Sequence, residues 1–198
     1  MASTTMTALR QINPIASTAA ILPHHRLAFN VPGTPFVEPS WASVEPVLLP
    51  VIPVPVVHGV LYKLTENDFE TVCQTEGVPF GYRLHRCRVI PYHGNDECAG
   101  QEAFMSLSSS STSTSSTKSI SAFTLRAGQR NWRESQVDIP PSQSYLNVLI
   151  RGAKEFHMDR DYVQSLERIP VGRTLIGNGL AERMLQAAEL QQQQRQGK

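Results

Sequence analysis

The chain has 198 residues, and its 18 basic and 17 acidic side chains give a formal net charge of +1. This length suits one domain with a hydrophobic core and is short for two. A charge near zero gives no electrostatic reason to expect nucleic acid or a membrane surface as the main partner, so we expect neither.

The three cysteines, Cys73, Cys87 and Cys98, form no paired framework and no CxxC motif. They indicate neither a secreted disulfide scaffold nor a zinc site, and they favour reduced thiols in a cytoplasmic protein. No run of about 18 apolar residues is present, so no membrane span is expected. The first 37 residues contain no acid, which leaves an organelle transit peptide as a weaker alternative.

Turn signals and hydrophobic patterns predict the first regular elements. Residues 26–30 predict a short strand that ends at the turn 31–35, and a proline-rich connection leads to residues 56–62, a β-branched run typical of a buried central strand. Thr65 and Asp68 then form a capping-box pattern, which predicts the start of a helix. The apolar face of this helix is expected to consist of Phe69, Val72 and Cys73.

Glu76 follows on the same helical face. It lies four residues after Val72, so helical spacing directs its carboxylate toward the core, just before Gly77 ends the helix. A buried acid is costly unless it is paired, protonated or faces a cleft. Because glutamates are mostly exposed, the local pattern alone favours a side chain that extends into solvent at the helix end.

The next strand is predicted at residues 82–90, and the pattern then dissolves. Residues 106–121, SLSSSSTSTSSTKSIS, form a low-complexity tract that cannot bury enough apolar surface to order itself, so we expect a disordered insertion. Residues 122–125 resume a strand, and the tract would then lengthen a loop between two paired strands.

Two further helices are expected toward the C-terminus. Ser142 caps the first, and residues 160–168 form the second, which stops at Pro170. The glutamine-rich segment 178–198 is predicted as an exposed helix with little to pack against. The apolar stripe of the first of these helices is expected to comprise Tyr145, Leu149, Gly152, Ala153 and Phe156.

Common catalytic and cofactor-binding motifs do not occur in the sequence. The six histidines have no metal-ligand spacing, and there is no glycine-rich phosphate loop and no GxSxG nucleophile motif. We therefore expect neither a metal nor another cofactor.

The remaining signal is an ordered set of short segments between Ile12 and Pro170. They are residues 26–30 (RLAFN), 41–46 (WASVEP), 58–62 (HGVLY), 76–78 (EGV) with Tyr82, 141–145 (PSQSY), 152–155 (GAKE), and Tyr162 with Leu166. No single segment is specific, but in this order the set resembles the gamma-glutamylcyclotransferase family.

The resemblance implies one α+β domain at residues 12–175, with a mixed, mainly antiparallel barrel-like sheet flanked by helices. Residues 1–11 would precede it as a residual segment, and residues 176–198 would follow it as a polar tail. It also implies that Glu76 is the general acid/base of a cyclisation in which the α-amino group of a γ-glutamyl amide attacks its own γ-carbonyl, releasing 5-oxoproline and a free amine. The residues implied to contact the substrate are Tyr82, Tyr145 and Gly77.

This reaction needs a folded substrate held close to one carboxylate, and no water, metal or cofactor. The expected partner is a small γ-glutamyl amino acid or peptide related to glutathione, and a homodimer is left open. For Tyr82 and Tyr145, an ordinary core position is the alternative, because buried tyrosines usually find a hydrogen-bond partner in either case.

The sequence departs from the family pattern at its start. Family members begin with a strand that ends in a Tyr-Gly-Ser-Asn loop, whose backbone amides receive the γ-glutamyl group and would stabilise an oxyanion. This sequence has no such motif and opens at Met1, about where the loop would have ended. We expect an N-terminally truncated gene model, with a splice form or a decayed copy as the other explanation. The alternative function is an inactive binding or regulatory homologue.

Overall fold

The computed structural model describes residues 5–34, 37–48, 53–108, 118–128 and 138–172, together with residues 187 and 190. Within these ranges no helix is long and apolar enough to cross a bilayer. In chain order the elements are η1 (Thr5–Leu9), a π-helical turn, then β1 (Ala16–Pro23), β2 (His25–Pro32), β3 (Ser40–Pro46), β4 (Val56–Lys63), α1 (Glu66–Thr75), β5 (Tyr82–Tyr92), α2 (Ala99–Ser108), β6 (Ile120–Ala127), α3 (Gln143–Glu155) and α4 (Arg160–Glu167).

A four-stranded antiparallel sheet in the order β4-β1-β5-β6 forms the centre of the fold, and β2 pairs with β3 in a separate hairpin. The four-stranded sheet is curled and flanked by helices, so the predicted α+β class is confirmed. The predicted pairing of the strands on either side of the serine–threonine tract, β5 and β6, is also confirmed.

The prediction that residues 56–62 form a central strand is wrong in its position. β1 takes the central place, and β4 lies at the end of the sheet, paired with β1 from Val56 opposite Pro23 to Lys63 opposite Ala16. A β-branched apolar run indicates that the faces of a strand are buried, but it does not indicate whether the strand is central. Helices can bury the faces of an end strand as well as those of a central one.

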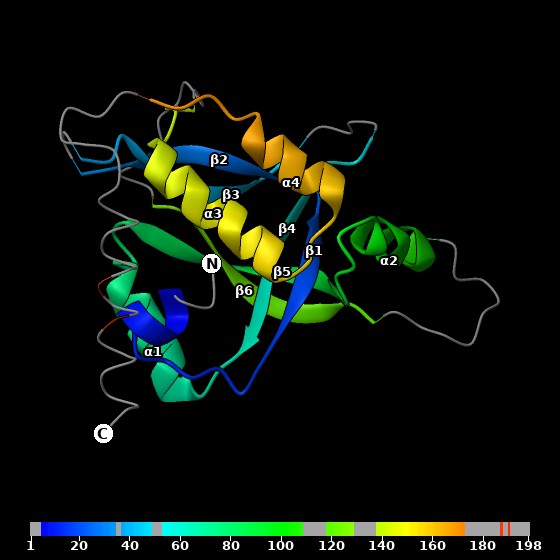
Figure 1. Cartoon of the computed structure of the whole chain (residues 1–198). Helices are drawn as coiled ribbons and strands as arrows, with labels where there is room; N and C mark the ends of the chain where they lie inside the picture. Colours follow the sequence, from blue (N-terminus) through cyan, green and yellow to red (C-terminus); the bar gives the residue numbers. More distant parts are fainter. Residues whose placement is uncertain are drawn as a thin grey trace.

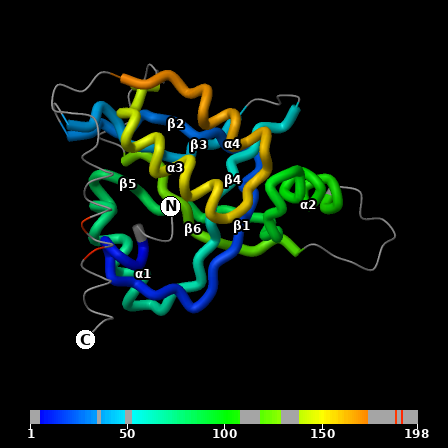
Figure 2. The backbone as a smooth tube through the Cα atoms, in the orientation of Figure 1, coloured from blue at the N-terminus to red at the C-terminus, as the bar shows by residue number. Residues whose placement is uncertain are grey.

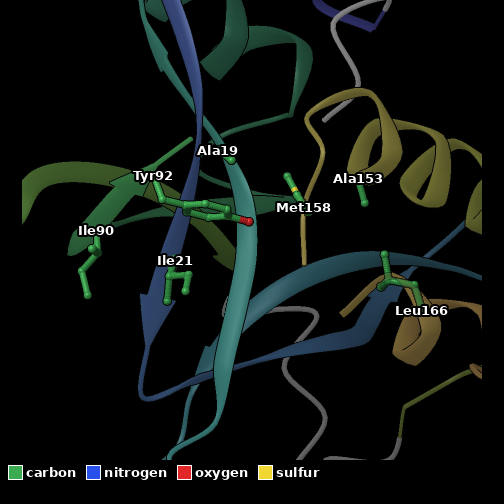
Figure 3. Packing of buried hydrophobic residues seen from close by; sticks show 7 residues of the cluster. All are labelled: Ala19, Ile21, Ile90, Tyr92, Ala153, Met158 and Leu166. Carbon is green, nitrogen blue, oxygen red and sulfur yellow. The ribbon is translucent and has the colours of Figure 1, made fainter. Parts of the chain in front are cut away.

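Helices cover the sheet from several sides. In Figure 1, α3 and α4 lie in front of the strands, while α1 and α2 lie at opposite sides of the molecule. α3 also buries residues outside its predicted stripe, such as Leu146 and Val148. Figure 3 shows the largest core cluster, to which β1, β5, α3 and α4 contribute. Its buried members are Ala19, Ile21, Ile90, Tyr92, Ala153, Met158 and Leu166.

The segment expected to be a disordered insertion, residues 106–121, is partly regular. α2 extends to Ser108 and β6 begins at Ile120, so both ends of the segment lie in secondary structure. The hydroxyl of Ser106 donates to the carbonyl oxygen of Glu102 at 2.8 Å, which accommodates a serine in the helix. Residues 109–117, and the predicted helix at 178–198 apart from two residues, lie outside the described residues.

The chain before β1 packs beside α1. Met6 and Ile12 are each only 1% exposed, and both contact Val72 of α1 in a small hydrophobic cluster. Figure 2 shows this N-terminal segment, in blue, passing α1 before it continues as β1. Met6 precedes the domain start at Ile12 that the sequence predicts, and the cluster fixes the position of the residues between them.

A buried ion pair joins the β2–β3 hairpin to β6. Glu45 of β3 is 6% exposed, and its Oε2 accepts hydrogen bonds from Nε and Nη2 of Arg126 at 2.9 and 2.7 Å. Its Oε1 accepts from the N–H of Ala127 and the hydroxyl of Ser43. Burial raises the pKa of the Glu45 carboxyl, but these partners outweigh burial, and the net pKa is lowered.

This lowered pKa predicts how stability depends on pH. Ionised Glu45 stabilises the fold above the unfolded-state pKa of about 4.3, and the contribution is lost as the pH falls through the lower folded-state pKa. The free-energy loss caused by Glu45→Gln should therefore be largest near pH 7 and should shrink below about pH 4. Urea unfolding at a series of pH values measures it. Glu167→Gln, in an exposed ion pair, should cost little throughout; an equal Glu45→Gln loss at pH 3 and pH 7 would contradict the prediction.

Candidate functional site

Glu76 is the residue at which α1 ends. The next two N–H groups, of Gly77 and Val78, donate to the carbonyl oxygens of Gln74 and Cys73 at 3.1 and 3.0 Å. These two bonds form a Schellman motif, which favours glycine after the cap because the backbone there turns left-handed. Gly77 has φ = +67°, so the glycine beside Glu76 is explained by the helix end, and the motif fixes the place at which the acid leaves the helix.

Arg10 holds the carboxylate of Glu76. Its Nη2 donates to Glu76 Oε1, and its Nε donates to Thr75 Oγ1 at 3.0 Å. The two charged side chains are only 13% and 15% exposed. Among the described residues, Oε2 of Glu76 makes no hydrogen bond. One carboxylate oxygen is therefore fixed, and the other can contact a bound molecule.

Tyr82 and Tyr145 both bind the backbone of Ala42 on β3. The hydroxyl of Tyr82 donates to the Ala42 carbonyl oxygen at 2.9 Å, whereas the hydroxyl oxygen of Tyr145 accepts from the Ala42 N–H at 3.2 Å. The phenolic proton of Tyr82 is thus already used. The phenolic proton of Tyr145 has no acceptor among the described residues, so this hydroxyl can still donate a hydrogen bond.

The first turn of α3 positions Tyr145. The hydroxyl oxygen of Ser142 accepts from the Tyr145 N–H at 3.1 Å, as an N-cap should. Buried Glu38 in turn accepts from the Ser142 N–H at 2.8 Å and from its hydroxyl, which places a negative charge at the positive end of the helix. The ring of Trp41 packs edge-on against Tyr145, with 4.8 Å between centroids.

Electrostatics keep both tyrosines protonated. Burial raises the pKa of Tyr82 and the pKa of Tyr145 well above the usual range for tyrosine, and the negative charge of Glu76 acts in the same direction. The positive charge of Arg10 opposes this effect at both phenols. Tyr82 and Tyr145 are therefore hydrogen-bonding groups near neutral pH and cannot serve as phenolate bases.

A pocket of about 940 Å³ adjoins these residues. Glu76, Tyr82 and Tyr145 all line it, whereas Gly77 does not belong to its lining. This volume lies within the range typical of small-molecule sites. Most other walls are apolar and come from the four-stranded sheet, α1 and α3; they include Leu61, Phe69, Leu84, Phe123 and Leu149.

The sequence and the structure agree on part of this site. Three of the four predicted residues, Glu76, Tyr82 and Tyr145, lie around one pocket, and their roles remain predictions. Arg10 has no signal in the sequence, because it lies 66 residues from Glu76 in a segment without periodicity. In the described part of the chain, no group of three or more His, Cys, Asp or Glu side chains could hold a metal ion.

Comparison with known proteins supplies related sequences. A model of the AIG2-like family matches residues 56–166. The chain is 31% identical over 164 residues to gamma-glutamyl cyclotransferase gliK of Claviceps purpurea, a match that covers 82% of this chain and 63% of that protein. It is 24% identical over 172 residues to gamma-glutamyl cyclotransferase aclK of Aspergillus oryzae, covering 79% of this chain and 53% of that protein. The chain thus spans less than two thirds of the length of either relative.

Solved structures share the fold. One, a gamma-glutamyl cyclotransferase, superposes with a TM-score of 0.63 at 18% sequence identity and covers 93% of this chain and 92% of that chain. An uncharacterized human protein gives the same TM-score and identity and covers 94% of both chains. At this identity the likeness concerns the fold alone. Together with the sequence matches, it confirms the predicted resemblance to the gamma-glutamylcyclotransferase family.

The helix end that carries Glu76 can be tested by adding one methyl group. Gly77→Ala should cost about 1–2 kcal/mol of stability, because an L-residue is strained at positive φ while nothing blocks the added Cβ. Denaturant unfolding measures the loss. Gly59→Ala is the matched control, since its Cβ would enter open space at ordinary φ. Equal stability of the two variants would show that the left-handed turn does not hold the helix end.

Proposed function

The chain belongs to the AIG2-like family, and on this basis we propose that it is a gamma-glutamyl cyclotransferase. Its substrate is a γ-glutamyl amino acid or peptide, and its products are 5-oxoproline and the free amine. The observation that carries the proposal is the carboxylate of Glu76, held through one oxygen by Arg10 and positioned on the wall of a pocket of small-molecule size.

The proposed reaction is a transfer of the γ-acyl group within the substrate. Glu76 accepts a proton from the α-ammonium group, and the freed nitrogen attacks the γ-carbonyl carbon to form the ring. The tetrahedral intermediate then collapses as the bond from the γ-carbon to the amide nitrogen breaks, and Glu76 returns the proton to the departing nitrogen, which leaves as a neutral amine. The ring nitrogen gives its second proton to Glu76, which passes it to the free amine to form an ammonium group. The α-nitrogen loses two protons overall and the departing nitrogen gains two, so the reaction consumes no water.

Positioning supplies much of the rate in this proposal. The nucleophile and the electrophile belong to one molecule, so a pocket that holds the substrate in its folded conformation removes much of the entropic cost of bringing them together. The tyrosines differ in role. Tyr145 retains a proton that can be donated to the oxygen that becomes negative, while Tyr82 uses its proton to hold Ala42.

We also propose a compartment, a metabolic role and an oligomeric state for the enzyme. The three free cysteines favour a reducing compartment such as the cytoplasm, which cell fractionation would test. Turnover of glutathione-related γ-glutamyl compounds is the proposed role, without a cofactor. A homodimer is the remaining partner proposal, and sedimentation equilibrium would test it.

The second candidate is a homologue that binds γ-glutamyl compounds without converting them. The protonated phenols of Tyr82 and Tyr145, together with the carboxylate of Glu76, could hold a γ-glutamyl compound without any reaction. Calorimetric binding of glutathione without release of 5-oxoproline would favour this candidate over the enzyme.

Replacing the acid tests the enzyme directly. Glu76→Gln should lower the rate of 5-oxoproline release by about 100- to 10,000-fold, because the amide cannot transfer the proton. The assay uses a panel of γ-glutamyl amino acids and glutathione. Glu70→Gln, on the exposed side of the same helix, is the matched control and should retain activity. A folded wild-type chain that releases no 5-oxoproline from any of these substrates would refute the cyclotransferase proposal.

Replacing Tyr145 and replacing Tyr82 should have different effects on kcat. Each change to phenylalanine breaks one bond to Ala42, so each should cost roughly 1 kcal/mol of stability. Only Tyr145→Phe also removes a free donor, and it should lower kcat by about 100-fold, well beyond the effect of Tyr82→Phe. Steady-state kinetics beside denaturant unfolding measures both. Equal loss of kcat in the two variants would contradict this assignment of the donor.

A further inference from the structure

Arg10 contacts Glu76 from outside the pocket. Glu76 belongs to the pocket lining, whereas Arg10 does not, although its Nη2 donates to Glu76 Oε1. A side chain outside the pocket does not contact the substrate, so Arg10 affects the reaction only through its hydrogen bond to the Glu76 carboxylate. We propose that Arg10 is the positioning residue of the reaction: it fixes the orientation of the Glu76 carboxylate. This inference rests on the proposed function.

The contact differs from an ordinary surface ion pair. Arg10 and Glu76 are 13% and 15% exposed, whereas Lys154 and Glu167, which form another ion pair, are 58% and 43% exposed. Exposed pairs contribute little because water screens them and flexible side chains lose entropy to form them. A pair screened less by water keeps both its electrostatic effect and its geometry.

A chain of hydrogen bonds orients the guanidinium group. Arg10 Nε donates to the hydroxyl oxygen of Thr75, and that hydroxyl donates to the carbonyl oxygens of Thr71 and Val72 at 2.9 and 3.1 Å. The planar fork of arginine can bind Thr75 and Glu76 at the same time, which a lysine ammonium group on its single flexible stem cannot do with the same geometry. The guanidinium is thereby tied to the last turn of the helix that carries the acid.

The backbone of Arg10 is also held in place. Met6 and Ile12, on either side of it, are buried against Val72 of α1, and the Ile12 N–H donates to the Met6 carbonyl oxygen at 3.0 Å. Figure 2 shows this segment passing next to α1. Arg10 therefore approaches Glu76 from an anchored loop, which supports a fixed geometry for the carboxylate.

The phenols of Tyr82 from β5, Tyr145 from α3 and Tyr62 from β4 also lie near the pair. Burial raises the pKa of each, so none of them carries a charge near neutral pH. Arg10 is therefore the charged group that holds the Glu76 carboxylate.

The test compares Arg10→Gln, Arg10→Lys and the wild type as full chains. Arg10→Gln should lower kcat by about 100-fold with little change in KM, because the carboxylate is no longer held in the orientation that proton transfer needs. Arg10→Lys should recover part of the loss, because it restores the charge without the fork. Lys154→Gln, which removes a cation from the exposed pair, is the control and should match the wild type in kcat and KM.

Several outcomes would overturn the inference. A loss confined to KM would mean that Arg10 binds substrate, and an Arg10→Lys variant as impaired as Arg10→Gln would mean a purely structural role. The carbon-13 signal of the Glu76 carboxyl at pH 7 adds a readout that needs no turnover. If the wild type is inactive, the proposed function fails alone, and a Glu76 signal that broadens in Arg10→Gln but not in Lys154→Gln still supports the positioning of Glu76 by Arg10. An unchanged signal would refute it.

Discussion

The β2–β3 hairpin must be held by the rest of the chain, because two isolated strands are marginally stable in water. Polar groups of β3 provide much of that support. Glu45 pairs with Arg126 on β6, the hydroxyl of Ser40 donates to the Ile139 carbonyl oxygen at 2.6 Å, and the peptide groups of Ala42 bind two tyrosine hydroxyls. Ser40 and Glu45 are buried and would be costly without their partners, so these bonds favour the docked position of the hairpin.

This constraint also divides the site into two parts. Tyr82 and Tyr145 are located by the docked hairpin, through Ala42. Glu76 is located by the end of α1 and by Arg10, and within the described part of the chain it makes no hydrogen bond to the hairpin. The pocket lies between these two supports, so its shape depends on how β3 and α1 are spaced across the sheet. The candidate catalytic geometry is therefore a property of the whole fold.

Local signals in the sequence predict the elements that carry the site. Thr65 and Ser142 cap α1 and α3 as expected, because capping depends on residues three positions apart. The sequence does not predict β1, since three of its eight residues are alanine, which has a weak strand preference, and the pairing with two neighbouring strands stabilises it. It cannot predict Arg10 either, because only the tertiary fold brings that side chain to Glu76.

The Schellman motif beside Glu76 allows the surrounding side chains to change during evolution. The backbone bonds that end α1 require a glycine and two carbonyl groups, and they place almost no demand on the side chains around the acid. Apolar residues of the pocket wall could therefore be exchanged over many generations while the carboxylate stays at the same point in space. Under the proposed function, selectivity for different departing amines could then evolve separately from the proton transfer.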